Sequence, residues 1–338
     1  MKLLYRAGSS VHRIVLFAVL LTTAATANLH AATETGVPQT PPPISGRNLS
    51  NPETILPADV LSRVELIRAN LELIRLHMGK PAGLVPALRV SRVGSEEVYS
   101  QALNLENRAN KLAHEQLGMY REPHPLPSGD VSPYRVFLIM DDVLQSVLAV
   151  KAKMGIKAAP VEKSQSPDSN IAEVFNASVA AGNEINSLLK IKSDPEYVLQ
   201  AIVEAVSIAS YLHYHGLDAA SLPSSPEFES NKSPNDVFAR MLKCFELISK
   251  LADNRGINTL KLDIPPERSM NIQPDDSSDL AFLLLTKLND IYEHTPGAME
   301  YPHVYAPGEI SAASVYQRVG LLERILNDLV ALEESNGN

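Results

Sequence analysis

The chain has 338 residues, a formal net charge of −9 and a single cysteine, Cys244. Nucleic acids and anionic membrane surfaces attract positively charged proteins, so we expect neither as the main partner of this acidic chain. One cysteine excludes an internal disulfide and a c-type haem attachment motif. Tryptophan is absent and aromatic residues make up only 5% of the chain, which is low for a sugar-binding surface.

The amino terminus has the pattern of a secretory signal peptide. Basic residues precede an uninterrupted apolar run over residues 14–21, and small residues then offer a cleavage site after Ala27 or after Ala31. The alternative is an uncleaved membrane anchor, but the apolar stretch is shorter than the roughly 20 residues that a bilayer-spanning helix needs. We therefore expect a signal peptide over residues 1–27 and a mature protein that is periplasmic, or secreted.

The segment after the signal peptide is expected to be a disordered, proline-rich tether over residues 28–56. Residues 37–44 read VPQTPPPI, a composition that favours extended polyproline conformation. A lipid anchor is not expected, because bacterial lipoprotein anchoring needs a cysteine at the cleavage point. No later segment approaches spanning length, so we expect no transmembrane segment in the mature chain.

An internal repeat organises the remaining residues. Apolar side chains follow a valine at intervals of seven, eleven and fourteen residues, which places them on one stripe of an α-helix. Glycines at the ends of the units, and Ser, Asp and Pro at their starts, agree with helix caps. The valine, followed by a bulky apolar residue, recurs with a spacing of 38 residues at Val60, Val98, Val136 and Val174, and again at Val198, Val237 and Val315.

The repeat predicts an all-α fold of eight helices, each of about 20 residues. The expected helix starts are near residues 57, 95, 132, 171, 194, 234, 277 and 311. Most linkers are 13 to 22 residues long, whereas a plain helical bundle uses roughly 2 to 8. Such a linker is long enough to return along a whole helix, so that neighbouring helices run parallel, or to fold over the bundle end.

The join between the fourth and fifth helices, residues 190–194, is the only short one and favours an antiparallel turn. It divides the chain into two halves of four helices each, residues 57–190 and 194–334. Two four-helix bundles and one continuous helical array both fit this pattern.

The sequence carries no motif for catalysis, for a cofactor or for a metal ion. There is no nucleophile elbow, phosphate loop or dinucleotide fingerprint. The imidazoles of His213 and His215 are two residues apart and point to different sides of a helix. Cys244 occupies an apolar register position and is expected to be buried, and the Asp141–Asp142 pair is expected on a solvated helix face. We therefore predict no catalytic residues, no cofactor and no metal ligands.

Aromatic residues next to the repeated valines form the one candidate surface for a partner or ligand. Equivalent positions in a repeat array face equivalent neighbours, so these rings form either a ladder that grips a ligand or repeated anchors for the linkers. The aromatic positions are Tyr99, Phe137, Phe175, Phe238 and Tyr316.

These features favour an exported, non-catalytic helical-repeat protein that acts as a binding module or scaffold in the cell envelope. Its partner would be another envelope protein or a second copy of the chain. One alternative is a bundle that senses or binds a small molecule in a pocket between helices, where convergent polar groups are expected. Another is an enzyme whose site is assembled from distant linkers, where close titratable groups with perturbed pKa values are expected.

Overall fold

The computed structural model describes residues 54–81, 89–127, 129–161, 168–190, 195–217, 221–263, 274–297 and 310–336. The predicted all-α fold is confirmed, and every predicted helix start lies within three residues of the observed one. Within the described residues the elements are α1 (Pro57–His77), β1 (Arg89–Ser91), α2 (Ser95–Leu117), α3 (Pro133–Lys153), α4 (Ile171–Leu188), α5 (Pro195–Leu217), α6 (Pro234–Asn254), β2 (Lys261–Asp263), α8 (Pro274–Glu293) and α9 (Ala312–Asn336).

Several sequence-based expectations concern residues that the structure does not describe. The signal peptide, the tether up to residue 53 and residues 191–194 of the short join all lie outside the described residues. At the described edge of the tether, Ile55 is buried against the helical core. None of the described helices combines the length and the hydropathy that a bilayer crossing demands.

Local sequence explains where the helices begin and end. The Ser233 hydroxyl accepts a hydrogen bond from the Asp236 backbone N–H at 3.3 Å, and the Asp236 carboxylate accepts one from the Ser233 backbone N–H at 2.8 Å. This reciprocal pair caps the start of α6. Helix α2 ends at Gly118, which has a φ of 67°. That left-handed conformation suits glycine and closes the last turn.

The repeat register builds the core. In seven of the helices the apolar residues at positions seven, eleven and fourteen after the valine are at most 2% exposed, with α8 following a looser version of the pattern. Cys244 belongs to this set, so its predicted burial is confirmed. Burial also raises the pKa of its thiol. The stripe that defines each helix in the sequence is therefore the surface on which the helices pack.

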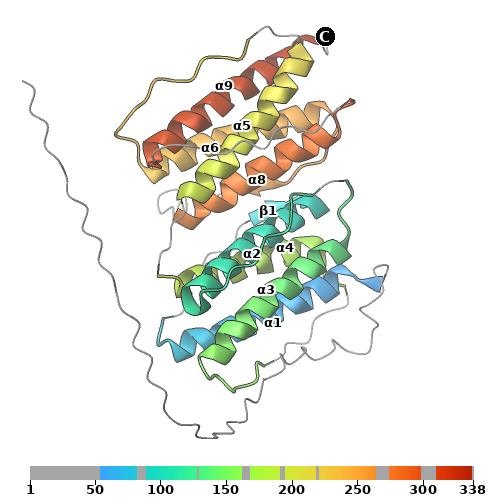
Figure 1. Ribbon diagram of the computed structural model, residues 1–338. Coiled ribbons are helices and arrows are strands. Elements are labelled where there is room, and N and C mark those ends of the chain that lie inside the picture. Colours follow the sequence, from blue (N-terminus) through green and yellow to red (C-terminus); the bar gives the residue numbers. More distant parts are fainter. Residues whose placement is uncertain are drawn as a thin grey trace, which may run out of the picture. The chain divides into compact units, whose positions relative to one another are not determined.

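The helix contacts form two rings of four. In the N-terminal bundle, α1 and α2 each contact α3 and α4, and in the C-terminal bundle, α5 and α6 each contact α8 and α9 (Figure 1). The first and second helices of each bundle, α1 with α2 and α5 with α6, thus lie diagonally across it, as do the third and fourth. The division of the chain into halves at residues 57–190 and 194–334 stays a prediction.

All four helices of the N-terminal bundle run in the same direction. Their first turns meet around one small apolar cavity of about 30 Å³, to which α1, α2, α3 and α4 contribute Val60, Val98, Val136 and Val174. The ion pair between Arg68 of α1 and Glu184 of α4 fits the same parallel alignment.

The C-terminal bundle is also parallel. Tyr197 and Tyr211 of α5 contact Phe282 and Tyr292 of α8, in the same order along both helices. Arg240 of α6 pairs with Glu323 of α9, and Arg255, the residue that follows α6, pairs with Glu333 of α9, again in matching order. The contact of Phe245 with Lys287, and that of Arg255 with Thr295 just beyond the two helix ends, align α6 with α8 in the same sense.

Because neighbouring helices are parallel, each linker must return along the bundle to the starting end. Hydrogen bonds from helix side chains to linker carbonyls show the direction in which two of the linkers run. Along the linker over residues 118–132, the Arg121 carbonyl accepts from Asn110 of α2. The later Pro125 carbonyl accepts from Tyr99, about three turns nearer the start of the helix. In the linker over residues 218–233, Ser224 contacts Arg324 of α9 and Pro226 contacts Gln317. Both linkers therefore run antiparallel to a helix that they cover.

The two bundles run in opposite directions where they meet. Moving forward along α2 from Ser100 to Arg108, the partner on α8 moves back from Thr286 to Asp279. A short antiparallel pair of strands, β1 with β2, joins linkers of the two bundles beside this contact. The start of α2 consequently lies near the end of α8.

Replacing Asn289 tests the attachment of a linker across the two bundles. The buried Asn289 amide donates to the Pro127 carbonyl at 3.0 Å. We expect Asn289→Leu, which keeps the size of the side chain, to lower the free energy of unfolding by about 1–3 kcal/mol, because a buried carbonyl loses a donor. Urea unfolding measures the change. Asn327→Leu, at an exposed position on α9, is the control and should change stability by less than about 0.5 kcal/mol; equal effects would contradict this role of Asn289.

Candidate functional site

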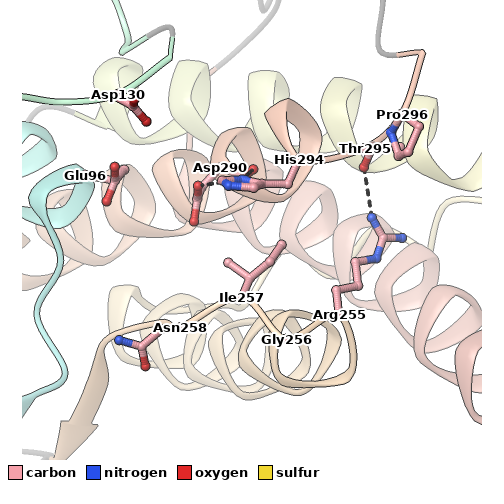
Figure 2. A pocket seen from close by; sticks show the side chains of 10 residues that line it. All are labelled: Glu96, Asp130, Arg255, Gly256, Ile257, Asn258, Asp290, His294, Thr295 and Pro296. Atoms are coloured by element: carbon pink, nitrogen blue, oxygen red, sulfur yellow. Dashed lines mark hydrogen bonds and ion pairs between the residues drawn. The ribbon is translucent and has the colours of Figure 1, made fainter.

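A cleft of about 780 Å³ lies where the start of α2 meets the ends of α6 and α8. It is lined by one turn of α2, the linker before α3, and the segments that leave α6 and α8. Figure 2 shows Asp290 and His294 between Glu96 on one side and Thr295 with Arg255 on the other. The lining residues are Glu96, Asp130, Arg255, Gly256, Ile257, Asn258, Asp290, His294, Thr295 and Pro296.

Three carboxylates from different elements face this cleft. Glu96 lies in the first turn of α2, Asp130 precedes α3, and Asp290 lies in the last turn of α8. Burial raises the pKa of Asp290, and repulsion from the nearby Glu96 and Glu97 carboxylates raises it further. The Glu96 and Asp290 carboxylates are therefore close enough to repel one another, and a bound positive charge would relieve that repulsion.

The positive groups of the cleft are already engaged. The Arg255 guanidinium is paired with Glu333 and donates to the Thr295 hydroxyl at 2.9 Å. His294 Nδ1 lies 2.9 Å from the Asp290 carbonyl oxygen and 3.1 Å from its carboxylate. The carbonyl contact, followed by the carboxylate, raises the pKa of His294. Because both cationic side chains are paired, the cleft lining as a whole is negatively charged.

The carboxyl ends of two helices add further negative charge to the cleft. Helix α6 ends at Asn254 and α8 ends at Glu293, both at the cleft. The carboxyl end of a helix carries a partial negative charge of about half a unit. The cleft therefore offers a negative environment that suits an ammonium or guanidinium group, and its described lining includes no Phe, Tyr or Trp ring for stacking.

A buried ion pair lies one residue away from the cleft lining. The Glu97 carboxylate accepts hydrogen bonds from the backbone N–H groups of Gly94 at 2.6 Å and Leu260 at 2.9 Å, and lies 3.6 Å from Lys287 Nζ. Lys287 is only 2% exposed, and burial lowers its pKa to about 8, with Glu97 opposing the shift. The pair joins α2, α8 and the segment after α6, so it holds the three walls together.

The depressed pKa of Lys287 predicts how stability depends on pH. Between about pH 8 and about pH 10.5 the folded protein has released this proton while the unfolded chain still binds it, so the free energy of unfolding rises with pH. The rise should reach about 3 kcal/mol when the wild type is compared with Lys287→Met by chemical denaturation at each pH. Lys250→Met, at an exposed position on α6, serves as the control, and a wild-type profile parallel to that of Lys287→Met would count against the shift.

The five predicted aromatic positions do not line the cleft. Tyr99, Phe137, Phe175 and Phe238 are buried in the core, and Tyr316 is half-buried. Their described contacts are those expected of anchors within the fold. Cationic side chains lie over three of the rings, and the Tyr99 hydroxyl donates to a linker carbonyl. Arg63 lies over Phe137, Arg135 over Tyr99, and both Lys232 and Arg240 over Tyr316.

Replacing Tyr99 tests whether its hydroxyl fastens a linker. This hydroxyl donates to the Pro125 carbonyl at 3.1 Å. We expect Tyr99→Phe to cost about 1 kcal/mol of folding stability, the usual net value of one hydrogen bond. Thermal and urea unfolding provide the measurement. Tyr134→Phe removes a hydroxyl that makes no hydrogen bond with the described residues, so it should change little; an identical loss in both variants would argue against the anchor.

The histidine pair of α5 and the aspartate pair of α3 are also described by the structure. His213 is buried with Nε2 3.4 Å from Asp328, whereas His215 is exposed, so the two imidazoles do face different sides. Asp141 lies 3.3 Å from Arg63, and Asp142 lies 3.1 Å from Arg121, so both acids have cationic partners.

The residues of the cleft were not singled out from the sequence as a site. Glu96 is an ordinary first-turn acid and His294 an ordinary residue after a helix. They become neighbours only because α2 and α8 pack antiparallel, and nothing in the linear pattern marks that pairing. The weak signal available is the clustering of acids at the start of α2.

Comparison with known proteins gives no relative: no protein-family model matches the chain, and no curated protein or solved structure matches it either.

Proposed function

We propose that this protein is an exported, non-catalytic binding protein that holds a small cationic ligand in the acidic cleft between its two bundles. The observation that carries the proposal is the convergence of Glu96, Asp130 and Asp290 on one solvent-accessible cavity. Export is supported by the amino-terminal sequence pattern. This function combines the expected binding role with a pocket between helices.

The size and lining of the cleft support a small organic ligand. Its volume of about 780 Å³ falls within the range of roughly 300–1,000 Å³ that is usual for such sites. Carboxylates bind ammonium and guanidinium groups through charge-assisted hydrogen bonds, which are stronger than neutral ones. Asn258 adds an amide that can both donate and accept. Amines, amino acids with basic side chains and short polyamines fit this chemistry.

The enzyme alternative has less support. Perturbed pKa values at Asp290 and His294 meet one expectation for a catalytic site. Their causes are the burial of Asp290, the carbonyl contact of His294 and the mutual ion pair, which also serve to hold a binding wall in place. A bound ligand recovered chemically unchanged would favour binding over catalysis.

A thermal-shift and calorimetry panel tests the proposed ligand class. Spermidine, putrescine, arginine and lysine should raise the melting temperature because they bind only the folded chain, whereas glutamate and glucose should not. We expect Asp290→Asn and Glu96→Gln each to weaken cation binding about tenfold, equal to about 1.4 kcal/mol. Added salt should weaken binding in the wild type.

The matched control is Glu122→Gln, which removes an exposed carboxylate of the linker over residues 118–132 outside the cleft. It should leave cation binding unchanged. Stabilisation by no cation in the panel, or equal affinity in wild type and Asp290→Asn, would exclude the cleft as the binding site. A partner captured from the envelope in that case would favour the scaffold role.

A further inference from the structure

A second group of ligating side chains lies outside the cleft, where the linker over residues 118–132 crosses the N-terminal bundle. Glu106 comes from the middle of α2, His124 from the linker and Asp142 from α3. Each offers one ligand atom, and these atoms lie within 4.8 Å of one another. The three segments are brought together only because the linker returns along α2.

The contacts of His124 assign its proton. The buried Glu106 carboxylate lies 2.8 Å from His124 Nδ1 and accepts a hydrogen bond from the His124 backbone N–H at 3.0 Å. An ionised carboxylate only accepts, so Nδ1 carries the hydrogen. In the neutral imidazole the lone pair is then on Nε2, on the opposite side of the ring.

That lone pair faces a second carboxylate. His124 Nε2 lies 3.8 Å from Asp142 Oδ2, which is too long for a hydrogen bond. The other Asp142 oxygen, Oδ1, is already 3.1 Å from the Arg121 guanidinium. Two electron-rich atoms that face each other across this gap are stabilised by a positive charge between them, either a second ring proton or a metal ion.

The gap has the right width for a transition metal. Zinc binds imidazole nitrogen at about 2.0–2.1 Å and carboxylate oxygen at about 2.0–2.2 Å, so one ion in a bent arrangement spans 3.8 Å. A carboxylate that accepts from the other ring nitrogen is the usual support of a metal-bound histidine, and Glu106 occupies that place. The side chains of His124 and Asp142 are 31% and 45% exposed, which provides an entry path and room for water ligands.

We infer that Glu106, His124 and Asp142 form a zinc-binding site that fastens the linker over residues 118–132 onto α2 and α3. His124 Nε2 and Asp142 Oδ2 bind the ion, water completes its coordination, and Glu106 orients the imidazole. Nitrogen ligation favours zinc over calcium or magnesium, which prefer oxygen. This inference is independent of the proposed ligand in the cleft.

The test titrates zinc chloride into chelator-treated, full-length mature protein, with a chromophoric chelator as competitor. The wild type should bind one ion and gain melting temperature. Asp142→Asn should bind at least about tenfold more weakly, Glu106→Gln about tenfold more weakly, and His124→Ala should lose the zinc-dependent gain. Arg121→Gln should bind more tightly, because a competing cation leaves Asp142.

His114→Ala is the matched control, since His114 is exposed on α2 and lies outside this group. Circular dichroism establishes that each variant is folded, and Asp142→Asn keeps the test decisive if removal of a buried group loosens the linker. Hydrogen exchange of residues 121–131 should slow on zinc addition in the wild type and not in Asp142→Asn. The inference is overturned if the wild type binds no zinc, or if Asp142→Asn and His124→Ala bind it as tightly as the wild type; the contact would then be an ion pair of protonated His124.

Discussion

Parallel packing is the constraint on which the rest of this structure depends. When all helices of a bundle start at the same end, the chain must travel the length of the bundle before each new helix begins. A helix of about 20 residues is about 30 Å long, so even a fully extended linker needs about nine residues to return to the starting end. Linker carbonyls, which have no strand partner, accept hydrogen bonds from helix side chains instead. The donors include the buried Asn110 and Tyr99 and the half-buried Gln317.

The two bundles run in opposite directions, and this creates both the cleft and the contact of α2 with α8, which we call the seam. Since α2 and α8 are antiparallel, the first-turn acids of one bundle lie against the carboxyl ends of helices in the other. An acid in the first turn of a helix interacts favourably with the partial positive charge at the amino end of that helix. Here Glu96 also faces Asp290, an unfavourable contact that folding tolerates because the Glu97–Lys287 pair and the Arg108–Asp279 ion pair hold the seam beneath it.

Features that depend on residues within one helix could be predicted from the sequence, whereas features that depend on how helices pack could not. The valine repeat predicted eight helices and the residues on their buried stripes, because each stripe is determined within one helix. Whether the linkers return along a helix or fold over its end was left open, since linkers of this length can follow either path. The cleft and the Glu106–His124–Asp142 group were missed for a related reason, because each combines single residues from segments that only the packing of the bundles brings together.

The diagonal placement of the first two helices of each bundle has a consequence for how the chain folds. The first strong partner of α1 is α3, whose start lies 76 residues after that of α1, and the first strong partner of α5 is α8, 79 residues on. The successive helices α2 and α3, and likewise α6 and α8, do pack together, but as parallel neighbours joined by a long linker and not as a tight hairpin. Folding must therefore wait for contacts of long sequence separation, which makes it slow for an all-helical protein. A nascent chain of this design therefore gains its first strong helix contacts only when the third helix of a bundle is made.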